Sequence, residues 1–277
     1  MNETPPGAAR QASYRTALAG AATLLLLITA RPASAQIPLG AAGSYSVLGG
    51  SAVTNTGATI VTGDLGVSPG TSVTGFPPGI VASGSIHSAD ASAAQAQASV
   101  TTAYNTAAGL PCGTNLTGMD LGGMILTPGV YCFNSSAGLT GTLTLDAQGS
   151  STAFFLFQIG STLTTASASQ VVVINSPPSN CDDNIFWQVG SSATLGTGSS
   201  FQGNILALTS ITLTTNASVN GRTLARNGAV TLDTNLVGAC NLAPAVVTPV
   251  GGPFLSGMSL TLLAALIAGF ALIALRR

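Results

Sequence analysis

The segment TLTTNASVNGRTLA at residues 212–225 is part of a repeat, because TLGTGSSFQGNILA at residues 194–207 has the same outline 18 residues earlier. Both begin with a T-L-x-T phrase, which also occurs at 162–165 and 231–234. A period of 18–20 residues is too short for a pair of helices and suits one coil of a β-solenoid, with three short strands joined by tight turns. The gap of 32 residues between the first two phrases predicts an inserted loop, SPPSNCDDN, at residues 176–184.

One face of each predicted coil is apolar at nearly every position. It carries AFFLFQIG (153–160), NIFWQVG (184–190) and NILALTS (204–210). A strand that is apolar on both sides is covered on both sides. We therefore expect another element to lie against the outer side of this face.

The stretch SADASAAQAQASVTTAYNTAAGL at residues 88–110 predicts the covering element, a helix over about 88–109. Ser88 is placed to cap its start, Asp90 suits the positive end of the helix, and Gly109 with Pro111 close it. One side of the predicted helix carries a narrow apolar stripe of Ala93, Ala96, Val100, Tyr104 and Ala107, which can lie close against a sheet.

The second face is formed by the T-L-x-T phrases. Alternation along a strand points Leu163, Leu195, Leu213 and Leu232 inward and the flanking residues outward. The third face begins where each phrase turns, at TASAS (165–169), TGSSFQ (197–202) and TNASVN (215–220), and it also presents small hydroxyl or amide groups. Which of these two faces contacts a ligand stays open, so the candidate binding residues come from both: Thr162, Thr164, Thr165, Thr194, Thr197, Ser200, Thr212, Thr214, Thr215, Ser218, Thr231 and Thr234.

Charge is scarce along the chain. Charged residues make up 5% of the sequence, against about 25% in typical globular proteins. Lys is absent, and seven Asp stand against two Arg between residues 36 and 250, so nucleic-acid binding is not expected. A stiff grid of Thr methyl and hydroxyl groups can hold water in a fixed pattern, because Thr has few χ1 options. The ligand that suits an uncharged periodic grid is itself periodic and uncharged, which favours the surface of ice.

Several phrases in the same order resemble the ice-binding protein family of cold-adapted microbes. They are GSYSVLGGSAVTNTGATIVTGDLGVSPGTSVTGFPPG (43–79), the 88–110 stretch, LTPGVYCF (126–133), NIFWQVGSSATLG (184–196) and NGRTLARNGAVTLDTN (220–235). The resemblance covers about residues 37–240. It implies a mainly β fold, a discontinuous right-handed β-solenoid of triangular section with a long helix packed alongside, in which one flat face binds ice. Some members carry T-A/G-x-T/N on that face, and TGSS (197–200) and TASA (165–168) match this motif in part.

The sequence also bears on two other classes of function. A cell-surface structural or adhesive solenoid without ice activity is the alternative to an ice-binding protein that inhibits ice growth or attaches a cell to ice. A polysaccharide-active enzyme would need carboxylates that converge in a cleft. The Asp residues are scattered, apart from Asp182-Asp183 in a Pro-rich loop, and His87 has no recognisable nucleophile near it in sequence. We therefore expect no enzyme, no cofactor and no small-molecule substrate, and a monomer.

Both ends carry segments typical of export. Arg10 and Arg15 precede the apolar run 17–30, and ASA (33–35) offers a cleavage site, which predicts a signal peptide over 1–35. After the solenoid domain (36–240) and a linker (241–253), residues 254–275 are uncharged and long enough to span a membrane, and Arg276-Arg277 favour a cytoplasmic end. This tail resembles IPTL-CTERM and PEP-CTERM sorting signals. We expect an exported protein that is at the cell surface, anchored in the membrane or released extracellularly.

The four cysteines of an exported chain predict two disulfides rather than a metal site. They are Cys112, Cys132, Cys181 and Cys240, and C-x-x-C is absent. Cys112 and Cys132 flank a 19-residue loop, and Cys181 and Cys240 could close a second one. Three connectivities remain open.

Overall fold

The computed structural model describes residues 37–177 and 184–238. The predicted signal peptide, the linker and the apolar tail lie outside the described residues, as do Cys181, Cys240 and the Asp182-Asp183 pair. Within the part that is described, the structure contains no helix long and apolar enough to cross a membrane.

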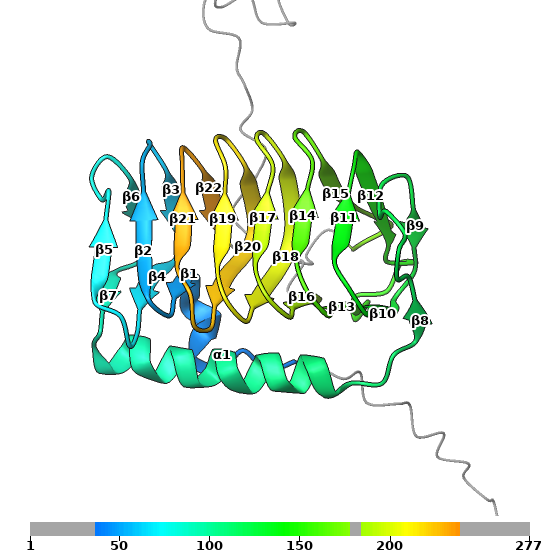
Figure 1. Cartoon of the computed structure of the whole chain (residues 1–277), viewed down its shortest axis with the longest axis horizontal. Helices are drawn as coiled ribbons and strands as arrows, with labels where there is room; N and C mark the ends of the chain where they lie inside the picture. Colours follow the sequence, from blue (N-terminus) through cyan, green and yellow to red (C-terminus); the bar gives the residue numbers. More distant parts are fainter. Residues whose placement is uncertain (1–36, 178–183, 239–277) are drawn as a thin grey trace, which may run out of the picture. The chain divides into compact units, whose positions relative to one another are not determined.

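The described residues form a parallel β-solenoid with one long helix, α1 (Ala91–Gly109), along its side (Figure 1). Each coil contributes to three faces, as the repeat predicts. The threonine face is a seven-stranded sheet in the order β11 (Ala137–Leu139), β14 (Leu163–Thr165), β17 (Ala193–Leu195), β19 (Ile211–Leu213), β21 (Val230–Leu232), β2 (Ala52–Asn55) and β5 (Ser72–Thr74).

The other two faces share one sheet. The helix-covered face contains β8 (Thr114–Asn115), β10 (Gly129–Phe133), β13 (Phe155–Ile159), β16 (Ile185–Val189), the second halves of β18 (Ser200–Ala207) and β20 (Ser218–Ala225), and then β1 (Tyr45–Gly49), β4 (Asp64–Val67) and β7 (Ile86–Ser88). The third face contains β9 (Ile125–Leu126), β12 (Thr142–Asp146), β15 (Gln170–Ile174), the first halves of β18 and β20, β22 (Leu236–Gly238), β3 (Ile60–Thr62) and β6 (Ile80–Ala82).

The strands β18 and β20 run through a corner of the solenoid, and a glycine in each permits the bend. Gly203 and Gly221 are paired in register, with φ of +104° and +147°. A Cβ on Gly221 would lie 2.0 Å from the Gly203 carbonyl oxygen, so the two backbones approach more closely than any other residue allows. The shared Gly of SFQGNILA and SVNGRTLA therefore marks the corner of a coil.

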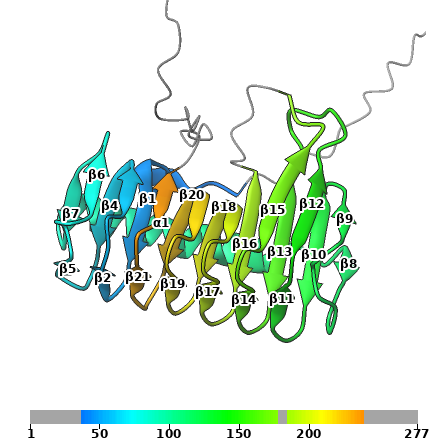
Figure 2. The same ribbon diagram turned by 90° about the horizontal axis from the view of Figure 1, so that it is seen from above.

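The coils do not follow one another along the solenoid in sequence order. The chain starts in the middle with β1 and builds coils toward one end, as far as β7. Helix α1 then runs back along the solenoid to the far end, and the later coils return from β8 to β22 (Figures 1 and 2). The last coil pairs with the first, through β20 on β1, β21 on β2 and β22 on β3. We call this junction the seam.

The apolar phrases of the helix-covered face supply two cores, which confirms the prediction that this face is covered on both sides. Phe157 and Trp187 point into the solenoid and stack with ring centroids 3.9 Å apart, while Leu156 and Phe186 point outward against the helix. From the helix, Ala96, Val100, Ala103, Tyr104 and Ala107 join this outer core. The inner core runs the length of the solenoid and the outer one fixes α1 to it.

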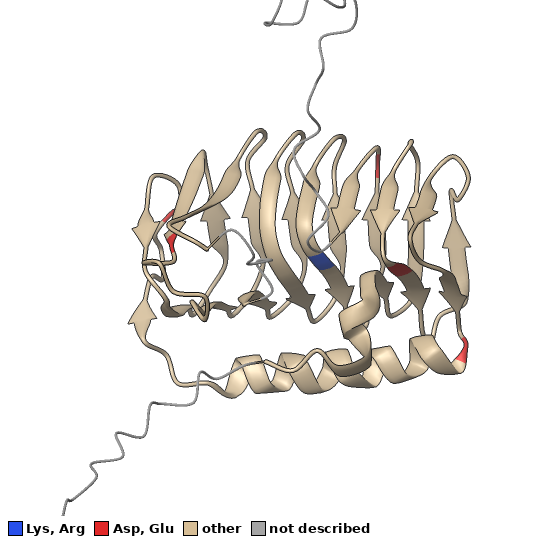
Figure 3. Cartoon of the chain, turned by 180° about the vertical axis from the view of Figure 1, so that it is seen from behind, with Lys and Arg blue, Asp and Glu red and all other residues tan. Residues whose placement is uncertain are grey.

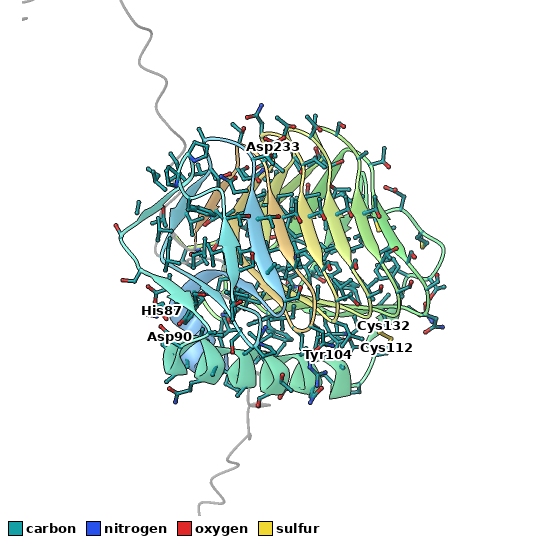
Figure 4. The ribbon with its side chains drawn as sticks, turned by 60° about the vertical axis from the view of Figure 1, so that its left-hand side comes forward. His87, Asp90, Tyr104, Cys112, Cys132 and Asp233 are labelled. Carbon is teal, nitrogen blue, oxygen red and sulfur yellow. A yellow bond between two sulfur atoms is a disulfide. The ribbon has the colours of Figure 1, made fainter. Side chains whose placement is uncertain are left out.

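The start of α1 differs from the prediction. Ser88 belongs to β7 and its hydroxyl donates to the Thr71 carbonyl, so it does not cap the helix. Asp90 is the N-cap, and its Oδ1 accepts from the Ala93 N–H at 2.8 Å. His87 Nδ1 lies 2.7 Å from Asp90 Oδ2, at the end of the helix shown in Figure 4. Asp90 caps the helix and also contacts His87, whereas the Ser88 hydroxyl is used in its bond to Thr71.

Two repeated glutamines and the Cys112–Cys132 disulfide tie the helix to the coils. Gln158 Nε2 donates to the carbonyls of Ala107 and Leu110, each at 2.7 Å, and Gln188 Nε2 lies 2.8 Å from the Tyr104 hydroxyl. The disulfide forms at the far end, just after the helix (Figure 4). The first of the two predicted disulfides is therefore present, while the Cys181–Cys240 pair stays a prediction.

Candidate functional site

A single row of threonines runs along the threonine face. Strand register places Thr164, Thr194, Thr212, Thr231, Thr54 and Thr74 side by side in that order, with Gly138 before Thr164. All six point outward and are exposed or half-buried. Because neighbouring strands lie about 4.8 Å apart, the row presents equivalent methyl and hydroxyl groups at that spacing.

A second row of small residues lies beside the first. The residue two positions before each threonine of the row, or before Gly138, points to the same side, about 6.6–6.8 Å along the strand. This row consists of Ser136, Thr162, Ser192, Ser210, Ala229, Ala52 and Ser72. Thr162 donates from Oγ1 to Ser136 Oγ at 2.8 Å, so the predicted residue Thr162 belongs to this row.

Buried side chains lie beneath the two rows and support the sheet. One of the predicted binding residues is among them and so is not at the surface. The four leucines predicted to point inward are all buried. However, strand pairing displaces the T-L-x-T phrase at 162–165 by two residues relative to the phrase at 194–197. Leu163 pairs with Ala193, and Thr164 pairs with Thr194. Thr165 therefore takes the inward place that Leu195 holds in the next coil. It is 3% exposed and its hydroxyl accepts from the Gly196 N–H, so its prediction as a contact residue is wrong.

Four other predicted residues lie at the corner between the threonine face and the third face. Thr214 Oγ1 donates to the Leu195 carbonyl at 2.8 Å, and Thr197 Oγ1 donates to Thr214 Oγ1 at 3.3 Å. Thr215 and Thr234 donate to Asp233, at 2.5 and 3.1 Å. These hydroxyls are held by the turn and do not continue the flat grid.

Asp233 lies two residues after Thr231 of the threonine row, at the corner where it is labelled in Figure 4. Hydrogen bonds from the hydroxyls of Thr215, Thr234 and Thr56 to its carboxylate lower the pKa of Asp233 below the usual value. The side chain is therefore negatively charged at neutral pH. It follows Leu232 directly, so it lies at the margin of the face and not within it.

Ser200 and Ser218 lie on the third face, where their neighbours are not uniform. Their row continues through Leu236 to Ile60 and Ile80, which are 40% and 54% exposed. Some of the predicted binding residues therefore form a regular grid on the threonine face. The others lie at the corner, on the third face or in the core, outside that grid.

Thr54 and Thr74 are part of the row and were not among the predicted residues. Both belong to coils that precede the helix, in the phrases SAVTN (51–55) and TSVTG (71–75). The shared signal is an inward apolar residue followed by Thr, as in Val53-Thr54, Val73-Thr74 and Val230-Thr231. A search for that pair, rather than for T-L-x-T, finds every threonine of the row.

The threonine face carries no formal charge, since its seven strands contain no Asp, Glu, Lys or Arg. Figure 3 shows the few charged residues of the described part of the chain scattered over the solenoid and the helix. Over residues 37–177 and 184–238, no group of three or more His, Cys, Asp or Glu is placed to hold a metal ion. Asp64, Asp120 and Asp146 accept hydrogen bonds from backbone N–H groups near turns.

The two rows together form a rigid, uncharged surface that can order water. Each threonine has few χ1 options, and the parallel ladder beneath fixes its backbone, so little conformational freedom remains to be lost on binding. Hydroxyl groups form hydrogen bonds with water at the protein surface, and they orient that water less strongly than a charged group does. Such a surface suits a ligand whose own oxygen atoms repeat in two dimensions.

Comparison with known proteins agrees with this description. The family model described as "Ice-binding-like" matches residues 47–238. An ice-binding protein of Nostoc sp. (strain HG1) is 60% identical over 208 residues, which cover 74% of this chain and 76% of that protein.

Solved structures give the same result. The crystal structure of an ice-binding protein from the Antarctic ascomycete Antarctomyces psychrotrophicus is 41% identical with a TM-score of 0.69, and the match covers 73% of this chain and 97% of that one. An ice-binding protein from an Antarctic biological consortium is 48% identical with a TM-score of 0.69, over 73% of this chain and 90% of that one. The chain therefore belongs to the ice-binding-like family.

Proposed function

We propose that this protein binds ice through the threonine face. The observation that carries the proposal is the in-register row of Thr164, Thr194, Thr212, Thr231, Thr54 and Thr74, uncharged and beside a second row of small residues. Adsorption along this row would hold the protein on the crystal, so that ice grows between adsorbed molecules only with difficulty. Affinity for ice then comes from the regular positions and restricted rotamers of the threonines, and not from charged groups.

The threonine face is preferred to the third face for a physical reason. On the third face the outward side chains change from Ser and Gln to Leu and Ile along one row, so equivalent polar groups do not repeat. In contrast, the threonine row keeps one residue type over six consecutive strands. The helix-covered face is excluded because α1 buries it.

The proposal is tested by thermal hysteresis, the gap between the melting and freezing points of an ice crystal in the protein solution. Thr212→Tyr places a bulky ring in the middle of the row, and Ser200→Tyr places the same ring on the third face. We expect hysteresis in the wild type and in Ser200→Tyr, and its loss in Thr212→Tyr. Retention in Thr212→Tyr together with loss in Ser200→Tyr would assign the activity to the third face.

We also propose that the protein is exported and held at the cell surface by residues 254–275. The apolar character of this segment and the Arg276-Arg277 end support the proposal. Gly238, the last described residue, lies on the third face and not on the threonine face. Fractionation of cells, with mass spectrometry of the mature N-terminus, tests both parts. Recovery of an unprocessed chain in the cytosol would contradict them.

A further inference from the structure

The seam divides the threonine row into two parts that no short segment of chain connects. Elsewhere a coil is joined to the next by the chain itself, as Thr212 is to Thr231. At the seam, Thr231 and Thr54 are 177 residues apart in the chain, and the ladder of β21 and β2 and a hydrogen bond from Thr54 Oγ1 to Thr231 Oγ1 join them. Something other than chain continuity must therefore fix their relative position.

A buried polar network crosses the seam just below the corner of the threonine face. Asn55 is 6% exposed and occupies the inward place that Leu232 holds across the seam. Its Nδ2 donates to the Gly75 carbonyl at 2.8 Å, and its Oδ1 accepts from Thr59 Oγ1 at 2.6 Å. Thr59, which is fully buried, is thus joined to two coils on its own side of the seam.

The network continues on the other side through Asn235. The Asn235 N–H donates to Thr59 Oγ1 at 2.9 Å, across the seam. Asn235 Nδ2 then donates to the carbonyls of Thr214 and Ala217, each at 2.9 Å, and its Oδ1 accepts from the Asp233 N–H at 2.6 Å. The network of Asn55, Thr59 and Asn235 therefore spans four consecutive coils, two on each side of the seam.

Stability alone does not require polar groups here, because Leu195 and Leu213 fill the equivalent inward places in neighbouring coils. A buried polar network is often no more stabilising than apolar packing, but it is satisfied in one arrangement only and so specifies register. A slip of two residues at the seam would keep apolar side chains inward and shift every threonine beyond it. The network would be broken by such a slip.

We infer that Asn55, Thr59 and Asn235 are positioning residues for the binding face. They fix the register across the seam, so that Thr54 and Thr74 continue the row that ends at Thr231. The inference rests on the proposed function, because the row matters only if it contacts ice. It adds a role for three buried residues that do not themselves reach the surface.

The variant Thr59→Val tests the inference, because it keeps the branched shape and removes the hydroxyl shared by Asn55 and Asn235. Thermal hysteresis is measured for Thr59→Val alone and in a Thr54→Ala/Thr74→Ala background. We expect Thr59→Val to lower hysteresis to the level of the Thr54→Ala/Thr74→Ala protein, and to cause no further loss in that background. The losses of hysteresis are then not additive, as expected if Thr59 acts by positioning Thr54 and Thr74. General destabilisation of the fold would instead lower hysteresis in both backgrounds.

Thr223→Val is the matched control. Thr223 is also fully buried and pairs with Val47 across the seam, but its hydroxyl donates to the Ser46 carbonyl under the helix-covered face. We expect its hysteresis to equal that of the wild type. Asn55→Leu is a second test variant, since it introduces the side chain that the equivalent places carry, and we expect it to behave as Thr59→Val.

Three results would overturn the inference. They are wild-type hysteresis in Thr59→Val, an equal loss in both backgrounds, or failure of both Thr59→Val and Asn55→Leu to fold, which would mean that the network holds the fold rather than the register. Absence of hysteresis in the wild type is a different outcome and would instead contradict the proposed function.

Discussion

Thr54 and Thr231 stand 177 residues apart in the chain and side by side on the threonine face, where the Thr54 hydroxyl lies 3.4 Å from Thr231 Oγ1. This contact shows how the face is made. Coils formed before the helix and coils formed after it supply members of the same row. A regular surface therefore depends on long-range strand register as well as on the repeat.

Replacement of Asp233 by Thr is expected to increase thermal hysteresis. Asp233 lies two residues after Thr231, in line with Thr214 and Thr56 of the neighbouring coils, and its lowered pKa keeps it charged at neutral pH. A fixed charge at the margin orders nearby water around itself, and Thr would remove that competition. Hysteresis at neutral pH, with Asp146→Asn as a control at a distant turn, is the measurement. Unchanged or lower activity in a folded Asp233→Thr protein would contradict the expectation.

The stability of the protein is expected to fall in acid. In Asp90 the Ala93 N–H and then His87 lower the pKa, and in Asp146 the Asn175 side chain and then the Gln148 N–H do so. Burial raises the pKa of Asp120, but hydrogen bonds from Thr140 and Gly122 outweigh it, and that pKa too is lowered.

A carboxyl group with a lowered pKa in the folded state stabilises the fold above its unfolded pKa of about 3.9, and this contribution is lost as pH falls through the folded value. Calorimetry should therefore show a melting temperature that decreases as pH is lowered from about 4 toward 2. A melting temperature that rises over this range would show that these hydrogen bonds do not stabilise the folded state.

Trp187→Ala is expected to destabilise the fold by about 3–5 kcal/mol, because it leaves a cavity in a closely packed core. Trp187 is fully buried, stacks on Phe157 and donates from Nε1 to the Gln202 carbonyl at 2.9 Å. Urea unfolding followed by circular dichroism measures the loss. A change below about 1 kcal/mol would mean that the inner core can collapse around the deleted ring.

Removal of the Cys112–Cys132 disulfide is expected to cost about 3 kcal/mol, the value for a closed loop of this size. The bond joins the segment after α1 to β10, on the helix-covered side and away from the threonine row. A Cys112→Ala/Cys132→Ala protein should thus unfold at lower denaturant concentration and keep its hysteresis near 0 °C. Loss of hysteresis in the folded double variant would link this end of the solenoid to the binding face.

The sequence predicts the elements that depend on local pattern. The 18-residue repeat predicts the solenoid, and the doubly apolar phrases predict the helix-covered face, because both signals lie within one or two coils. The T-L-x-T repeat predicts Thr194, Thr212 and Thr231 as candidate binding residues for the same reason. Gln158 and Gln188 occupy equivalent places in AFFLFQIG and NIFWQVG, but their contacts to the helix follow only from the fold.

What the sequence does not show depends on pairing between distant segments. T-L-x-T at 162–165 reads like its neighbours, but strand register displaces it by two residues and buries Thr165. Thr54 and Thr74 precede the helix and join the row only because the last coil pairs with the first. Likewise, Asn55 looks like a turn residue in sequence, and only the folded chain places it in the core.

Ice-affinity partitioning of the wild type and Thr212→Tyr together tests whether the threonine face binds ice. Equal amounts of both proteins, distinguished by mass, are placed in one solution from which an ice hemisphere is slowly grown. If the threonine face binds ice, the wild type is enriched in the ice fraction and Thr212→Tyr stays in the liquid. Exclusion of both proteins from the ice, or their equal enrichment, would show that the threonine face is not the ice-binding surface.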